Sequence, residues 1–169
     1  MTPLYKQIDQ LPVEIHATNA ALGMAAASAA IATIQAAIAE KGDANVILAT
    51  GNSQLSLFAG LRAATSVDWS RVRVFHMDEY VGITDQHPAS FSRFLRERIL
   101  NDLRPGAFYP IDGMAPWLEQ ECARYADLLR RHPADLCCLG YGENGHIAFN
   151  DPPFAEFNDP LWVKVVRLA

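Results

Sequence analysis

The chain has 169 residues, half of them apolar, and a formal net charge of −5 at pH 7. This length and composition suit one domain with one hydrophobic core, and the interspersed charges, without a basic block, argue against a nucleic-acid partner. Three cysteines, Cys122, Cys137 and Cys138, are an odd number without C-x-x-C spacing, which argues against a disulfide framework or a zinc knuckle.

The first forty residues predict one alanine-rich helix and no secretory signal. Residues 1–14 lack the basic start and apolar core that a signal peptide needs. Residues 20–40 are rich in alanine, with polar interruptions that make them too weakly hydrophobic for a membrane span. Apolar side chains recur there at helical spacing: Met24, Ile31, Ile34 and Ile38. Lys41-Gly42 ends the pattern. We therefore expect a cytoplasmic protein without a membrane partner.

From residue 45 onward, predicted strands and helices alternate. Strands are expected at 45–50, 71–77, 107–112 and 135–140, and helices at 53–64, 90–100 and 117–132. One more strand is expected to start within 161–168. Strands separated by helices predict a Rossmann-like, doubly wound α/β fold, with a mostly parallel sheet and helices on both faces.

Three predicted strands end in polar segments. These are Thr50-Gly51-Asn52-Ser53-Gln54, His76-Met77-Asp78-Glu79-Tyr80, and the glycine-rich loop of residues 139–153. In a parallel sheet, ligands bind beyond the carboxyl ends of the strands, so we expect the three segments to meet at one rim.

The glycine-rich loop carries Gly140, Gly142 and Gly145 in the G-x-G-x-x-G spacing of a dinucleotide site. That site requires a helix directly after the glycines, and Pro152-Pro153 would stop such a helix within two turns. We therefore reject the dinucleotide interpretation. His146 in the same loop has the residue type of a proton shuttle near neutral pH.

A metal site is the rival interpretation of the histidines and carboxylates. The chain has no H-x-x-x-H or H-x-H pair, so we expect no metal. We also expect no cofactor. No G-x-S-x-G nucleophile motif is present, which leaves acid–base chemistry on a small anionic substrate.

The segment after the first strand suits a phosphate group. Gly51 is flexible, and the backbone amides around Asn52 and Ser53 would lie at the positive end of the helix. The P-loop lysine is missing, which argues against a nucleoside triphosphate. The simpler interpretation is that Asn52 or Ser53 only caps the helix.

The adjacent carboxylates Asp78 and Glu79 follow the second strand. Neighbouring side chains on a strand point to opposite faces, so both can face one ligand only if the chain turns there. A carboxylate partly buried at a strand end can have a raised pKa and act as a base. One of the pair is thus a candidate base, and the other a structural or solvated group.

These stretches, in this order, resemble the glucosamine-6-phosphate deaminase (isomerase) family, which shares a superfamily with the 6-phosphogluconolactonases. Residues 50–54 partly match the family's phosphate loop, and MDEYVG at residues 77–82 and HPASF at 87–91 are close matches. The most specific match is GHIAFND at residues 145–151. The resemblance runs from about residue 48 to 168.

The resemblance implies cofactor-free conversion of an amino-sugar 6-phosphate to fructose 6-phosphate and ammonia. Asp78 would move the proton between C2 and C1, and His146 would carry the proton of the ring oxygen. Asp151 matches a glutamate that orients the histidine, and Asn144 lies where many members have aspartate. The implied substrate contacts come from the segments already quoted: Thr50, Gly51, Asn52, Ser53, Glu79 and Gly145. Because Asp151 and Asn144 differ from the residues that many family members have there, the amino sugar stays open between the gluco and galacto forms.

Three alternatives stay open at this point: a 6-phosphogluconolactonase, a non-catalytic phosphosugar sensor and an inactive fragment. Family members run beyond residue 169 and supply a phosphate-binding lysine from that part. We therefore expect residues 1–169 to be a single α/β sugar-phosphate isomerase-type domain without its C-terminal part. It would bind phosphosugar weakly, and would not release ammonia by itself. A homo-oligomer is compatible with the resemblance.

Overall fold

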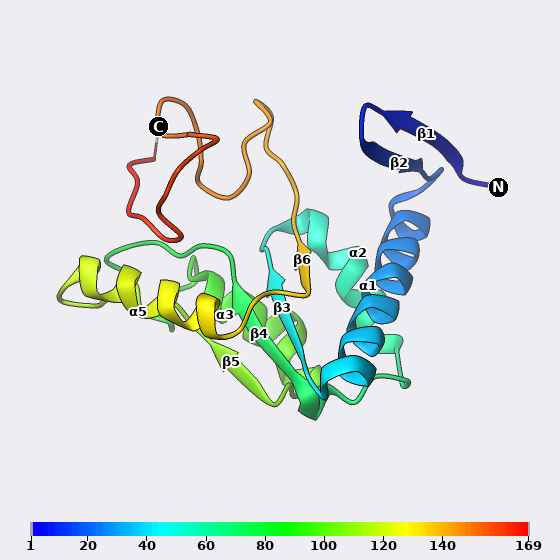
Figure 1. The fold of residues 1–169 in the computed structure, drawn as a ribbon, viewed down its shortest axis with the longest axis horizontal. Coiled ribbons are helices and arrows are strands. Elements are labelled where there is room, and N and C mark those ends of the chain that lie inside the picture. The colour runs from blue at the N-terminus through cyan, green and yellow to red at the C-terminus, as the bar shows by residue number, and fades with distance from the viewer. Residues whose placement is uncertain (1, 169) are drawn as a thin grey trace.

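The computed structural model describes residues 2–168, which form a four-stranded parallel sheet with helices on both faces and a separate hairpin (Figure 1). The strands are β1 (Leu4–Ile8), β2 (Leu11–Ile15), β3 (Ala44–Leu48), β4 (Val72–His76), β5 (Ala107–Tyr109) and β6 (Leu136–Cys138). The helices are α1 (Asn19–Lys41), α2 (Leu55–Ala63), α3 (Phe91–Leu95), α4 (Asn101–Leu103) and α5 (Leu118–Arg131). Three short elements complete the set: the 3-10 turns η1 (Asn52–Gln54) and η2 (Trp69–Arg71), and the π turn η3 (Arg96–Leu100) between α3 and α4.

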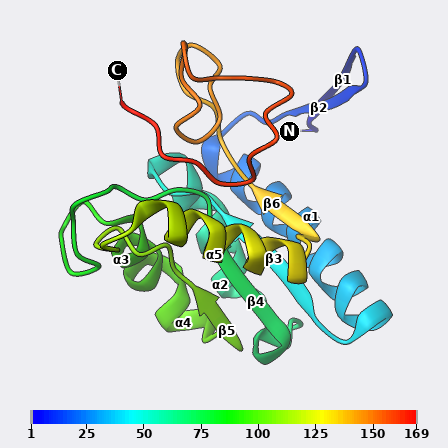
Figure 2. The same cartoon turned by 60° about the vertical axis from the view of Figure 1, so that its left-hand side comes forward.

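The parallel sheet has the order β5-β4-β3-β6, which confirms the predicted doubly wound fold. The chain moves from β3 through β4 to β5 in one direction and then returns to the other side of β3 with β6. Because such crossovers are right-handed, the reversal places α5 on the face opposite α2 and α3. Figure 2 shows α5 crossing in front of the sheet, with α1 and α2 behind it. The reversal point lies between β3 and β6, where ligands bind in such sheets.

The core forms because alternate strand residues face the two helix layers. Val72 and Val74 of β4 belong to the buried cluster between the sheet and helices α1–α4. Phe75 points to the other face, where its ring lies 6.1 Å from that of Tyr125 on α5. Burial on both faces explains the near-continuous apolar sequence of these strands.

Helix α1 has one packed face and one exposed face. Its buried residues recur every three or four positions: Gly23, Ala27, Ala30, Ile34 and Ala37. Small residues allow close contact with α2, since a Cβ on Gly60 would lie 2.4 Å from that of Ala27. The helix is long and apolar enough to cross a membrane by length and composition alone, and it packs against α2 and β3.

Two parts of the chain differ from the sequence-based expectation. Residues 4–15 form an antiparallel hairpin that was not predicted; all its strand residues are exposed except Val13, which is half-buried. The strand expected in 161–168 does not form; among the described residues, none after β6 belongs to a helix or strand. Local bonds explain this: the Asp159 carboxylate accepts from the Leu161 amide at 2.8 Å and pairs with Lys164 at 2.5 Å. Side-chain bonds of this kind compete with strand pairing.

Candidate functional site

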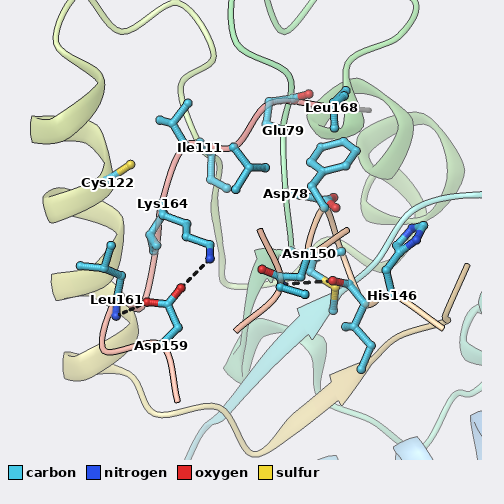
Figure 3. Close-up of a pocket in the computed structure, with 18 of the residues that line it drawn as sticks. Asp78, Glu79, Ile111, Cys122, His146, Asn150, Asp159, Leu161, Lys164 and Leu168 are labelled. Atoms are coloured by element: carbon cyan, nitrogen blue, oxygen red, sulfur yellow. Dashed lines mark hydrogen bonds and ion pairs between the residues drawn. The ribbon is translucent and has the colours of Figure 1, made fainter. Parts of the chain in front are cut away.

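The three polar segments predicted to meet do so at the carboxyl ends of β3, β4 and β6. They line a cavity of about 480 Å³ at the reversal point of the sheet. The predicted site residues on its wall are Thr50, Gly51, Ser53, Asp78 and His146. A larger cavity of about 1030 Å³ adjoins it beneath residues 150–168, and both share Asp78 and His146 (Figure 3). These two side chains therefore stand where both cavities meet.

The segment after β3 presents the start of a helix to the smaller cavity. Gly51 has a φ of 105°, and the chain then enters η1 and α2. The first amides of a helix have no partner within the helix, and they carry partial positive charge. No side chain caps either turn, so the simpler interpretation of Asn52 or Ser53 as a helix cap does not hold. The segment of residues 50–54 can therefore bind an anion through its backbone amides.

Asp78 has the environment of a base that works near neutral pH. Its carboxyl group is largely buried, and this burial raises its pKa to about 6, with a smaller contribution from the negative charge of Glu79. A carboxylate with such a pKa is ionised at pH 7 and more basic than an exposed aspartate.

Glu79 lines the larger cavity with Asp78, and its carboxylate is held by donors of the protein. Its Oε1 accepts from the amides of Tyr80 and Phe91, both at 3.0 Å. Its Oε2 accepts from the Ser90 hydroxyl at 2.8 Å and the Ser92 amide at 3.0 Å. Two carboxylate oxygens offer about four acceptor sites, and four protein donors fill them. A substrate that bound Glu79 would therefore have to replace one of these protein donors.

His146 is oriented by the two residues that the sequence placed around it. Its Nδ1 lies 2.7 Å from Asn144 Oδ1 and 2.9 Å from Asp151 Oδ1. The Asn144 amide nitrogen also donates to Asp151 Oδ1 at 2.6 Å. Both neighbours of Nδ1 are acceptors, so Nδ1 carries the hydrogen and Nε2 is left with a free lone pair. The Asp151 side chain is thus long enough to reach the histidine.

Two glycines of the loop are required by its shape. A Cβ on Gly142 would lie 2.2 Å from Cε1 of the His146 ring, so the ring can pack there only against a glycine. Gly145, directly before the histidine, has a φ of 83°, which other residues rarely adopt. The G-x-G-x-x-G spacing therefore shapes a histidine loop and opens no helix.

Two buried residues that sequence reasoning did not connect support the end of β4. The Tyr125 hydroxyl accepts from the His76 amide at 3.0 Å and donates to its carbonyl at 2.8 Å. His76 Nε2 accepts from the Ile111 amide at 2.7 Å, and burial lowers the pKa of His76 to about 4, so the ring is neutral. No local sequence pattern links Tyr125 to His76, because they lie 49 residues apart.

A metal has no evident place at this site. Within residues 2–168, no three His, Cys, Asp or Glu side chains are grouped so that they could hold one. The arrangement has a base, a histidine with a free nitrogen and a helix start suited to an anion, which together suit proton transfer on a small phosphorylated molecule.

Comparisons with known proteins agree with this chemistry. Residues 17–166 match the family model described as glucosamine-6-phosphate isomerases/6-phosphogluconolactonase. The glucosamine-6-phosphate deaminase of Bacillus cytotoxicus is 39% identical over 126 residues, which cover 75% of this chain and 48% of the relative. That of Bacillus cereus ATCC 14579 is 38% identical over 143 residues, covering 85% and 53%. The chain therefore spans about half the length of these relatives.

Solved structures of both activities resemble this fold. A monomeric glucosamine-6-phosphate deaminase is 29% identical with a TM-score of 0.71, covering 80% of this chain and 57% of that one. A 6-phosphogluconolactonase from Shewanella baltica is 30% identical, also with a TM-score of 0.71, covering 80% and 58%. The fold is therefore common to proteins with two different reactions.

Proposed function

Because this chain belongs to the family of glucosamine-6-phosphate isomerases and 6-phosphogluconolactonases, we propose that it forms the catalytic part of an amino-sugar-phosphate deaminase. The substrate class is an amino-sugar 6-phosphate, and the products are fructose 6-phosphate and ammonia. The observation that carries the proposal is that Asp78, with its raised pKa, and His146, with a free Nε2, line the same cavity.

The proposed reaction opens the sugar ring, moves a hydrogen from C2 to C1 and replaces the nitrogen at C2 by oxygen. The free Nε2 of His146 takes the proton of the C1 hydroxyl and passes it to the ring oxygen, which opens the ring to the aldehyde. Asp78 then takes the proton from C2 as the carbonyl oxygen at C1 gains one, which gives an enolamine. It returns its proton to C1 as the nitrogen loses one, so the double bond moves from the C1 carbonyl to a C2 imine. Water adds to the imine, and ammonia leaves to give the ketone. The proton transfers need neither an oxidant nor a metal.

The substrate's phosphate is proposed to bind at Thr50, Gly51, Asn52 and Ser53. Three of these residues line the smaller cavity, and the helix start supplies amide donors. Asn144 and Asp151 keep the His146 ring in one tautomer. The deaminase names of relatives at 38–39% identity support this choice of reaction.

The second candidate is hydrolysis of 6-phosphogluconolactone. The Shewanella baltica lactonase supports it, since its identity and TM-score match those of the deaminase structure. In that reaction His146 would activate a water molecule, and no proton would leave C2. Asp78 would then have no proton to move, although the site gives it a raised pKa. This difference favours the deaminase.

A side-by-side assay distinguishes the two reactions. We expect ammonia release from glucosamine 6-phosphate or galactosamine 6-phosphate by the chain extended beyond residue 169 and none by the 169-residue chain, and no faster loss of 6-phosphogluconolactone than in buffer with either. The assay uses the 169-residue chain and the chain extended by whatever its gene encodes beyond residue 169, because the relatives are about twice as long. Rapid lactone hydrolysis without ammonia, in either form, would decide for the lactonase.

A further inference from the structure

Glu79, the residue after the proposed base Asp78, connects the end of β4 to the start of α3. The Glu79 carboxylate accepts three hydrogen bonds from residues 90–92 at the start of α3, two from backbone amides and one from a hydroxyl. It accepts a fourth from the amide of Tyr80. The Asp78 end of β4 is thereby fixed to a helix that lies more than ten residues further along the chain. Charge-assisted bonds to amides at a helix start are among the stronger protein hydrogen bonds.

An aromatic cluster extends this connection to the histidine loop. The Phe91 ring lies 4.9 Å from the Tyr80 ring and 5.7 Å from the Phe149 ring, and Tyr80 and Phe149 are 5.3 Å apart. Phe149 follows His146 by three residues. Tyr80 therefore belongs to the Asp78 segment, Phe91 to the helix that Glu79 holds, and Phe149 to the His146 loop.

We infer that Glu79 is a positioning residue: its carboxylate, together with the cluster of Tyr80, Phe91 and Phe149, sets the position of Asp78 relative to His146. The inference rests on the proposed function only for the roles of Asp78 and His146. Glu79 lies on the wall of the larger cavity, but its acceptor sites are filled by the protein, so it acts on the site through these contacts.

The charge of Glu79 adds an electrostatic effect to its geometric one. It raises the pKa of Asp78, second to burial. Other titratable groups also lie near Asp78: His146 shares both cavities with it, and the charge of Asp78 acts on Tyr125 of α5. Close to Asp78, His76 on β4 is affected by the positive charge of Arg96 on η3 and by the negative charges of Glu79 and of Glu121 on α5. Glu79 thus affects both where the base lies and at which pH it is ionised.

Replacement of Glu79 by Gln tests the inference, with Glu97→Gln as the matched control. Glu97 lies on η3, where its exposed carboxylate pairs with Arg93 at 2.7 Å, so the control removes the same charge outside the site. In Glu79→Gln, the side-chain NH₂ would face protein donors in place of an acceptor. We expect faster hydrogen exchange at the amides of Phe91 and Ser92, and a lower titration midpoint of Asp78 by NMR.

Kinetics provide a second readout wherever ammonia release is measurable. Glu79→Gln should lower kcat by about 10²-fold, because a displacement of about 1 Å between reacting groups can cost that much. KM should stay within a few-fold, and the acid limb of the pH profile should move to lower pH together with the Asp78 midpoint. A role limited to overall stability would shift neither the limb nor the midpoint.

Three results separate this inference from the proposed function. Unchanged exchange at Phe91 and Ser92 together with an unchanged Asp78 midpoint would overturn the inference, even in an active enzyme. The expected NMR changes in a protein that releases no ammonia would support the positioning role and reject the deaminase. If Glu79→Gln does not fold, Glu79→Asp, which keeps the charge and shortens the side chain, should still speed exchange at these amides. Wild-type exchange there would overturn the inference.

Discussion

Asp78→Asn is expected to lower the rate of ammonia release by about 10² to 10⁴, the usual cost of losing a general base. Asparagine has nearly the same shape and cannot take the C2 proton, so KM should stay within a few-fold. In the wild type, kcat/KM should fall below about pH 6, where burial places the pKa of Asp78. Near-normal turnover of the variant would remove Asp78 from the mechanism.

The same substitution should stabilise the fold at neutral pH. The pKa of Asp78 is raised from 3.8 to about 6 on folding, so the folded state binds more protons than the unfolded state between these values. Stability therefore falls as pH rises through this window, and ionised Asp78 costs up to about 3 kcal/mol at pH 7. Thermal unfolding at pH 7 should show a higher midpoint for Asp78→Asn and no gain for the exposed Asp85→Asn. A lower midpoint for Asp78→Asn would contradict the burial argument.

His146→Gln is expected to slow the cyclic substrate far more than an open-chain analogue. The glutamine amide cannot carry a proton to the ring oxygen, so turnover of the cyclic sugar should fall by about 10² to 10⁴. The open-chain analogue bypasses that step and should lose much less. The comparison uses kcat on both substrates, with His16→Gln as the control, because His16 pairs with Glu14 beside the hairpin.

Equal losses on the two substrates would argue against a role of His146 in ring opening. A further variant, Asp151→Asn, tests whether the orientation of the His146 ring matters. If the bonds at Nδ1 matter, Asp151→Asn should slow the cyclic substrate in the same way as His146→Gln, but less strongly, because Asn144 would still accept from Nδ1 at 2.7 Å.

The parallel sheet could be predicted because each of its strands is a short apolar segment between helical ones. The ends of β3, β4 and β6 carry the polar residues, and parallel strands bring these ends to one rim. The hairpin at residues 4–15 was missed, because its strands are exposed and leave no buried face to read. The prediction of a strand at 161–168 was wrong. An apolar pattern does not supply a neighbouring strand to pair with, and Asp159 forms local hydrogen bonds with this segment instead.

At the site, too, the sequence could not predict contacts that depend on distant parts of the chain. The sequence could say that Asp78 and Glu79 face one ligand together only if the chain turns there, but not which of them lines the smaller cavity; it is Asp78. The choice depends on donors from residues 90–92, which approach Glu79 only when α3 packs beside β4. The pairing of His146 with Asn144 and Asp151 was closer to prediction, because all three lie within one loop.

The transfer of a proton between C2 and C1 by Asp78 is tested most directly by following deuterium at C1. Fructose 6-phosphate and ammonium are incubated with the protein in deuterium oxide, and the ketose is followed by NMR over many turnovers. We predict that deuterium accumulates at C1 with the wild type, and that Asp78→Asn slows this by the same factor as ammonia release. Deuterium incorporation at C1 by Asp78→Asn at the wild-type rate would contradict the account.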